Sequence, residues 1–296
     1  MIHANPQLER RFLLALGISL LVFLAELAGG WWTGSLALMS DSAHVFLDVF
    51  ALGLSYIALR VAALPADDRH TYGWHRLEVF AALANGVTLL AITLAIFYEA
   101  WGRLQNPAPI HSAEMLVIAT VGLVASLATA RVLEHHDDLN TRSAFLHVVG
   151  DALASFGVIV GGVVMLLTGW YAIDPLISAF IGAIIVVGSW RVLRSSLHIL
   201  FEGAPEGIAV GDVARAMGDV AGVQDVHDLH LWSICSGYPA LSAHVLVADA
   251  SCDATTAQLS VLKQTLAERF KIQHTTVQFE TTNCGQGTVV CQNNTM

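Results

Sequence analysis

Six long apolar stretches, separated by turn and polar signals such as Thr33-Gly34, Asn106-Pro107 and Thr168-Gly169, dominate the chain up to about residue 190. A helix that crosses the hydrocarbon core of a membrane needs roughly 20 mainly apolar residues. The stretches have about that length and cover residues 12–32, 35–59, 79–98, 113–133, 145–167 and 173–190. We therefore predict six transmembrane helices within a domain at 12–203, preceded by a cytoplasmic segment at 1–11.

The pattern changes after residue 203 to that of a small soluble domain at 204–296. Apolar periodicity predicts two helices and three strands, with alternating apolar positions in the second strand. Their order along the chain is helix 210–220, strand 226–234, strand 240–247, helix 255–270 and strand 275–279. This order predicts an α+β domain with both helices on one face of a sheet.

The arginines near the ends of the predicted spans indicate the orientation of the chain. Cytoplasmic segments of membrane proteins carry an excess of Lys and Arg. With the N-terminus in the cytoplasm, only Arg103 falls outside, and nine arginines fall inside: Arg10, Arg11, Arg60, Arg69, Arg76, Arg131, Arg142, Arg191 and Arg194. We therefore expect both termini in the cytoplasm.

Composition agrees with a membrane protein and excludes some partners. The chain is 55% hydrophobic and only 13% charged, which is unusual for a soluble domain. Its net charge of -10, with 14 Lys and Arg, argues against binding to nucleic acid. All four cysteines come late in the chain, on the expected cytoplasmic side, so metal ligation or simple burial is favoured over a disulfide framework.

Two predicted spans each carry a histidine followed four residues later by an aspartate. The pairs are His44 with Asp48 in the second span and His147 with Asp151 in the fifth. Residues four apart share one face of a helix, and ionisable residues inside a membrane are costly and usually functional. Two such helices side by side would bring together two nitrogens and two oxygens, a tetrahedral set that suits Zn²⁺. The alternative is that each pair is a hydrogen bond within its own helix.

Several segments resemble the signature segments of the cation diffusion facilitator family, in the same order. They are Ser40-Asp41-Ser42-Ala43-His44 followed by Asp48, residues 70–78, Gly150-Asp151 after His147, and residues 227–232. The resemblance covers about residues 16–280. It implies a homodimer of six-helix protomers, each with a ferredoxin-like cytoplasmic domain similar to copper chaperones. It also implies a transporter, not an enzyme, that exports divalent metal in exchange for protons across a bacterial inner membrane. The ligand set His44, Asp48, His147 and Asp151 is associated in this family with zinc, with cadmium or cobalt often tolerated.

The resemblance also implies accessory metal sites. Some bacterial members use an Asp and two His in the loop after the second span, where this chain has Asp67 and His70. Trp74 stands where the second histidine would be, and His75 follows it. A solvated loop without metal is the alternative there.

In the C-terminal domain, His227 and His244 fall on consecutive strands that a hairpin could bring together, and Glu280 ends the third strand. In similar family members these positions contribute to zinc sites at the dimer interface, with Cys284 and Cys291 as candidates to complete a second site. A purely structural dimerisation domain is the alternative.

Ligand chemistry connects zinc to protons. A histidine must be neutral and an aspartate ionised to bind metal, so protons and zinc compete for the same atoms. Two other classes of membrane protein fit the sequence less well. A membrane metalloenzyme would need a general base such as the Glu of His-Glu-x2-His, which is absent, and a metal sensor anchored in the bilayer would not need ligand pairs inside two spans.

Overall fold

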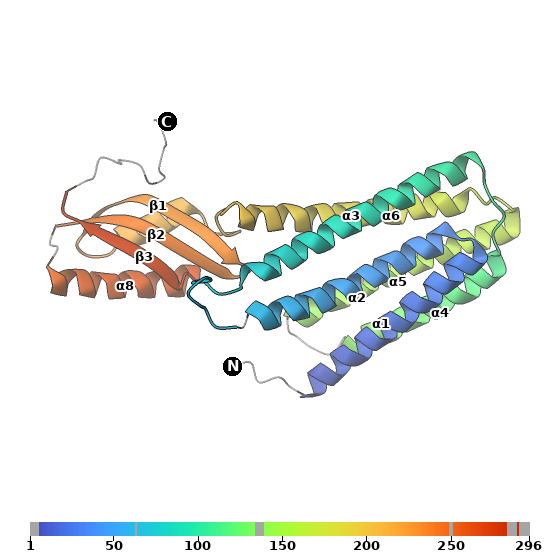
Figure 1. Cartoon of the computed structure of the whole chain (residues 1–296), viewed down its shortest axis with the longest axis horizontal. Coiled ribbons are helices and arrows are strands. Elements are labelled where there is room, and N and C mark those ends of the chain that lie inside the picture. The colour runs from blue at the N-terminus through green and yellow to red at the C-terminus, as the bar shows by residue number, and fades with distance from the viewer. Residues whose placement is uncertain (1–5, 63, 134–138, 249–250, 283–288, 290–296) are drawn as a thin grey trace. The chain divides into compact units, whose positions relative to one another are not determined.

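The computed structural model describes residues 6–62, 64–133, 139–248, 251–282 and residue 289 (Figure 1). The chain divides into two compact units. The first comprises Met1–Tyr56 and Ala84–Leu193, and the second comprises Ile57–Leu83 and Arg194–Met296.

Every apolar stretch predicted as a span is helical in the structure. The helices are α1 (Pro6–Thr33), α2 (Leu36–Ala62), α3 (Arg76–Gln105), α4 (Ser112–Leu133), α5 (Leu139–Thr168) and α6 (Ile173–Leu200). Gly34 and Gly169, which directly follow α1 and α5, have φ of 74° and 67°, the left-handed conformation that ends helices. Helix α6 continues to Leu200 beyond the predicted end at 190, because residues such as Arg194 still favour helix once a helix has formed.

Length and hydropathy together mark three segments of the described residues as able to cross a membrane. These are Leu16–Thr33, Arg76–Gln105 and Ile173–Leu200, and Ser112–Ala128 and Ala152–Thr168 are shorter apolar helices. The prediction of helices long and apolar enough to cross a membrane is therefore confirmed for these three segments. The number six remains a prediction.

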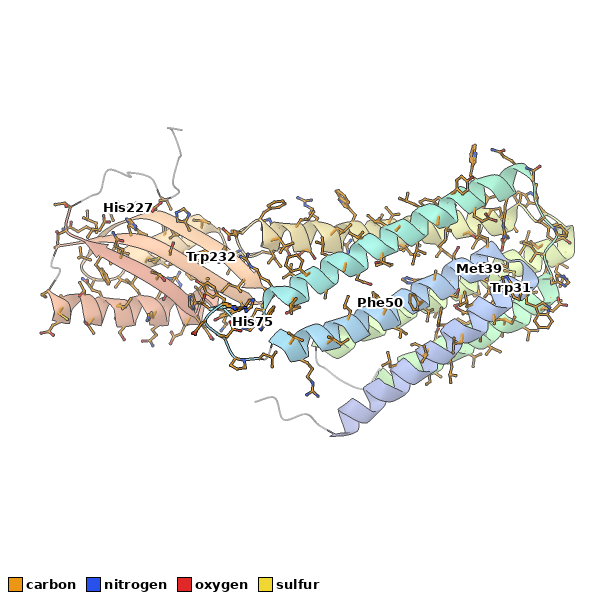
Figure 2. The ribbon with its side chains drawn as sticks, in the orientation of Figure 1. Trp31, Met39, Phe50, His75, His227 and Trp232 are labelled. Atoms are coloured by element: carbon orange, nitrogen blue, oxygen red, sulfur yellow. The ribbon has the colours of Figure 1, made fainter. Side chains whose placement is uncertain are left out.

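The first unit has large apolar side chains both in its buried core and on its exposed surface. Leu38, Met115, Val158 and Ile181, from four different helices, are buried together in its core. Other large apolar side chains are exposed, and Trp31 on α1 is 82% exposed (Figure 2). Extensive exposed apolar surface of this kind is typical of a protein that contacts lipid.

The second unit contains a three-stranded sheet in the order β1-β2-β3. Strand β2 (Tyr238–Val247) pairs antiparallel with β1 (Val223–Cys235) and parallel with β3 (His274–Glu280). Helices α7 (Val210–Gly218) and α8 (Cys252–Phe270) complete the predicted α-β-β-α-β order. Alternate residues of β2, including Leu241, Ala243 and Val245, share one core with Met217 of α7 and Leu262 of α8, so both helices cover the same face of the sheet.

Leu262→Ala is expected to destabilise the C-terminal domain by about 2 to 5 kcal/mol, because removing a fully buried leucine side chain leaves a cavity. The neighbouring Val261 is 49% exposed while Leu262 is fully buried, so Val261→Ala is a matched control whose effect should stay within about 0.5 kcal/mol. Urea unfolding of residues 204–296, followed through the fluorescence of Trp232, measures both. Equal effects of the two substitutions would contradict the assigned core.

Candidate metal sites

Helices α2 and α5 carry the two predicted ligand pairs of the first unit. His44 is partly buried on α2, whereas the side chains of Asp48, His147 and Asp151 lie outside the described residues. The convergence of the four ligands therefore stays a prediction.

A buried hydrogen bond joins α2 and α5 close to the predicted ligands. The hydroxyl of Ser155 donates to Oδ2 of Asp41 at 2.9 Å, and both side chains are buried. Asp41 precedes His44 by three residues and Ser155 follows Asp151 by four, so each lies about one helical turn from a predicted ligand. The two helices that carry the predicted ligands are thus held together at this level.

Three potential metal ligands meet on the sheet of the second unit. The ligand atoms of His227, His244 and Glu280 all lie within 4.8 Å of one another. His227 and His244 are direct partners across the β1–β2 pairing, and Glu280 on β3 lies opposite Leu246, two residues beyond His244. The predicted hairpin therefore brings the two histidines together, and the end of the third strand adds the carboxylate.

The carboxylate of Glu280 lies between the two imidazoles. Its Oε1 is 2.8 Å from His244 Nδ1, and its Oε2 is 3.4 Å from His227 Nε2. His227 is only 1% exposed, and Figure 2 shows it on β1. Two imidazoles and one carboxylate make a ligand set that suits Zn²⁺, with one position left for a further ligand.

Two further carboxylates, which lie outside the predicted ligand set, adjoin these histidines. Asp225 Oδ2 is 3.2 Å from His227 Nδ1, and Asp228 Oδ2 is 3.7 Å from His244 Nε2. A carboxylate that contacts the other nitrogen of a ligand histidine orients the ring and makes it a stronger ligand. Asp225 could have been found from the sequence, because residues two apart in a strand share one face. Asp228 could not, because it sits at an irregularity of β1 with φ of 48°.

No cysteine among the described residues belongs to the group of ligands formed by His227, His244 and Glu280. Cys284 and Cys291 lie outside the described residues. Val289 lies between them in the sequence, and its carbonyl accepts a hydrogen bond of 2.8 Å from the N–H of Leu229 on β1, two residues from His227. Burial, with a smaller effect of the nearby Glu78 charge, raises the pKa of Cys235 to about 11, so this thiol stays protonated and is a poor ligand.

The loop before α3 brings together two of the three predicted loop ligands. His70 Nδ1 is 3.1 Å from Asp67 Oδ1. The same oxygen accepts hydrogen bonds from the backbone N–H groups of His70 and Arg69, which hold the pKa of Asp67 below its ordinary value. The ring of His70 packs on Trp74 with 3.7 Å between centroids, whereas His75 packs on Tyr238 at 5.2 Å. His75 therefore contacts the sheet instead of Asp67 and His70.

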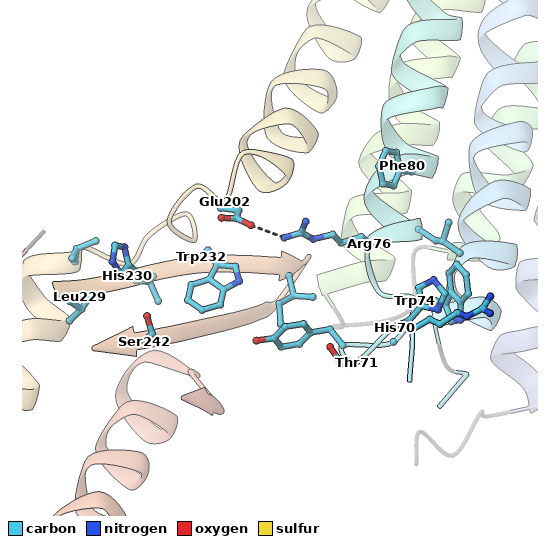
Figure 3. Close-up of a pocket in the computed structure, with 17 residues that line it drawn as sticks. His70, Thr71, Trp74, Arg76, Phe80, Glu202, Leu229, His230, Trp232 and Ser242 are labelled. Atoms are coloured by element: carbon cyan, nitrogen blue, oxygen red, sulfur yellow. Dashed lines mark hydrogen bonds and ion pairs between the residues drawn. The ribbon is translucent and has the colours of Figure 1, made fainter. Parts of the chain in front are cut away.

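The second unit contains a surface cavity of about 850 Å³ (Figure 3). His70, Trp74, Arg76, Glu202 and Trp232 are among its lining residues, and Arg76 forms an ion pair with Glu202 at 3.4 Å. His227, His244 and Glu280 do not line it. We assign no metal to this cavity.

Comparison with known proteins places the chain in a family. Residues 12–201 match the cation efflux transmembrane domain, and residues 205–282 match the cytoplasmic domain of cation efflux proteins. The metal cation efflux system protein CzcD of Cupriavidus metallidurans is 39% identical over 94% of this chain and 88% of its own length. The cadmium, cobalt and zinc/H(+)-K(+) antiporter of Bacillus subtilis is 37% identical over 87% of this chain and 84% of its own. The zinc transporter ZitB of Escherichia coli is 34% identical over 93% and 88%. The chain is therefore a member of the cation diffusion facilitator family, an integral membrane transporter of metal cations with a cytoplasmic C-terminal domain.

Proposed function

We propose that this protein exports Zn²⁺ from the cytoplasm in exchange for protons, through a site formed by His44, Asp48, His147 and Asp151. The observation that carries the proposal is the pair of His-x3-Asp segments on α2 and α5, two helices joined by the buried bond between Asp41 and Ser155. The relatives named as a zinc transporter and as a cadmium, cobalt and zinc/H(+)-K(+) antiporter support zinc as the substrate, with cadmium or cobalt as further substrates.

Alternating access of this one site to the two sides of the membrane completes the transport cycle. On the cytoplasmic side, neutral histidines and ionised aspartates bind zinc. On the outer side, protons from a more acidic medium displace zinc from the same atoms. His44 and His147 carry the protons, because the ordinary pKa of histidine lies near 6.5.

We further propose a topology in which all six helices α1 to α6 span a bacterial inner membrane, within a domain at residues 12–203. Both termini then lie in the cytoplasm, as the arginine distribution favours. The C-terminal domain at 204–296, with a ferredoxin-like fold similar to that of copper chaperones, forms a homodimer with a second copy.

The cluster of His227, His244 and Glu280 is proposed as a second zinc site with a regulatory or structural role. The short distances among its three ligands and the adjoining carboxylates support this role. Cys284 or Cys291 is the candidate for the remaining ligand. The predicted loop site of Asp67, His70 and His75 would require His75 to leave Tyr238 and join the other two residues.

Asp151→Ala is expected to abolish zinc flux while leaving a folded dimer, because the four-ligand site loses a charged donor. Zinc uptake into proteoliposomes loaded with a fluorescent zinc indicator measures this. Glu114→Gln removes an exposed carboxylate at the start of α4 and serves as the control, with flux near that of the wild type. Wild-type flux in Asp151→Ala would rule out the assigned site.

Zinc should stabilise isolated residues 204–296 through the histidine cluster. A ligand that binds only the folded state stabilises it by about 2.7 kcal/mol at 100 times its dissociation constant. His244→Ala should lose this gain, whereas His274→Ala, on the same sheet but outside the cluster, should keep it. Thermal unfolding with and without zinc makes the comparison. An undiminished gain in His244→Ala would mean that zinc binds elsewhere.

The histidines should set the pH dependence of transport. Apparent zinc affinity on the cytoplasmic side should fall as that side is acidified through about pH 7 to 6, because each imidazole must lose its proton to bind metal. His147→Asp should move this fall to lower pH, since a carboxylate releases its proton more readily. Proteoliposomes that contain a pH-sensitive dye measure proton movement alongside zinc flux. Zinc flux that moves no protons would make the protein a uniporter.

A further inference from the structure

A fully buried carboxylate, that of Asp174, lies at the start of α6 and contacts the start of α2. Its Oδ2 accepts a hydrogen bond from the Leu36 N–H at 2.7 Å, and its Oδ1 accepts one from the Ala37 N–H at 3.2 Å. The hydroxyl of Ser35 donates to Oδ1 at 2.6 Å. Asp174 itself is 0% exposed. One side chain of α6 thus binds three donors at the first turn of α2.

The arrangement is an N-terminal helix cap supplied from another helix. The first N–H groups of a helix have no acceptor within it and are usually satisfied by the residue just before the helix. Ser35 fills that role only for Leu38, whose N–H donates to the Ser35 hydroxyl at 3.1 Å. Asp174, 138 residues from Leu36 in the chain, satisfies the N–H groups of Leu36 and Ala37. Its negative charge also interacts favourably with the positive end of the α2 dipole.

Arg103, near the end of α3, extends this contact to a third helix. Its guanidinium lies 4.0 Å from Asp174 Oδ2 and donates a hydrogen bond to the carbonyl of Gly34, in the turn before α2. It also pairs with Glu99 at 2.9 Å. Asp174 on α6 and Arg103 on α3 therefore hold the start of α2, together with the turn before it. Figure 1 shows the neighbouring ends of α3 and α6.

We propose that Asp174 is a positioning residue for the transport site. Helix α2 carries His44 and Asp48, and His44 lies eight residues beyond Leu36, or about 12 Å along the helix axis. Because an α-helix is stiff over this length, fixing its first turn fixes the axial position and the rotation of His44. The inference rests on the proposed function, since it assigns Asp174 a role in placing two of the four proposed ligands.

The test is the zinc dependence of transport by Asp174→Asn in proteoliposomes. Misplacement of reacting groups by a mutation distant from them can cost up to about 100-fold, and we expect an increase in KM of roughly tenfold with a smaller fall in kcat. Asp174→Ala should raise KM further, because it leaves all three donors without this acceptor. Glu99→Gln removes the exposed partner of the same Arg103 and should keep the KM of the wild type.

A purely structural cap would lower the melting temperature without changing KM, and that result in folded Asp174→Asn would overturn the proposal. If neither Asp174 variant folds, Ser35→Ala and Arg103→Gln decide, because each removes one partner of the carboxylate. A raised KM in these variants supports the positioning role, and the KM of the wild type in both overturns it. Wild-type protein that moves no zinc would instead overturn the proposed function and this inference together.

Discussion

The high free-energy cost of placing ionisable groups between apolar helices constrains the whole membrane part of this protein. Two buried carboxylates among the described residues meet this constraint by hydrogen bonds between helices. Asp41 binds Ser155 across α2 and α5, and Asp174 binds the start of α2 from α6. Glu26 is buried on α1 beside Gly122 of α4, where any larger side chain would collide with its carboxylate. The polar groups of the bundle therefore also determine how its helices are arranged.

The chemistry of the C-terminal sheet follows from its strand order. Strand pairing places His227 beside His244, and the parallel third strand adds Glu280, so that carboxylates and imidazoles accumulate at one end of the sheet. A bound cation would compensate the negative charge of the carboxylates in this cluster. The opposite face of the sheet is covered by α7 and α8 through an apolar core, which supports the strands independently of metal.

The sequence predicted the elements well, because apolar runs and alternating apolar positions are local signals. The helices and the three strands lie within a few residues of their predicted positions. The exceptions are the ends of helices such as α6, which extend further than predicted. The pairing of His227 with His244 was also predictable, since a hairpin joins neighbouring strands. The cap by Asp174 was not, because it depends on a contact between residues 138 apart in the chain. The loop shows the same limit: Gly73, with φ of 72°, lies between His70 and His75, and only the folded structure shows that His75 contacts Tyr238.

The proposed transport mechanism requires that zinc binds four protein ligands, two imidazoles and two carboxylates, between α2 and α5. X-ray absorption at the zinc edge tests it most directly, on full-length protein in which His227→Ala and His244→Ala remove the C-terminal cluster. With one zinc bound per chain, we expect four nitrogen and oxygen neighbours at about 2.0 Å, two of them imidazoles, and loss of one imidazole signal in His147→Ala. Sulfur neighbours at about 2.3 Å, or a spectrum that His147→Ala leaves unchanged, would contradict it.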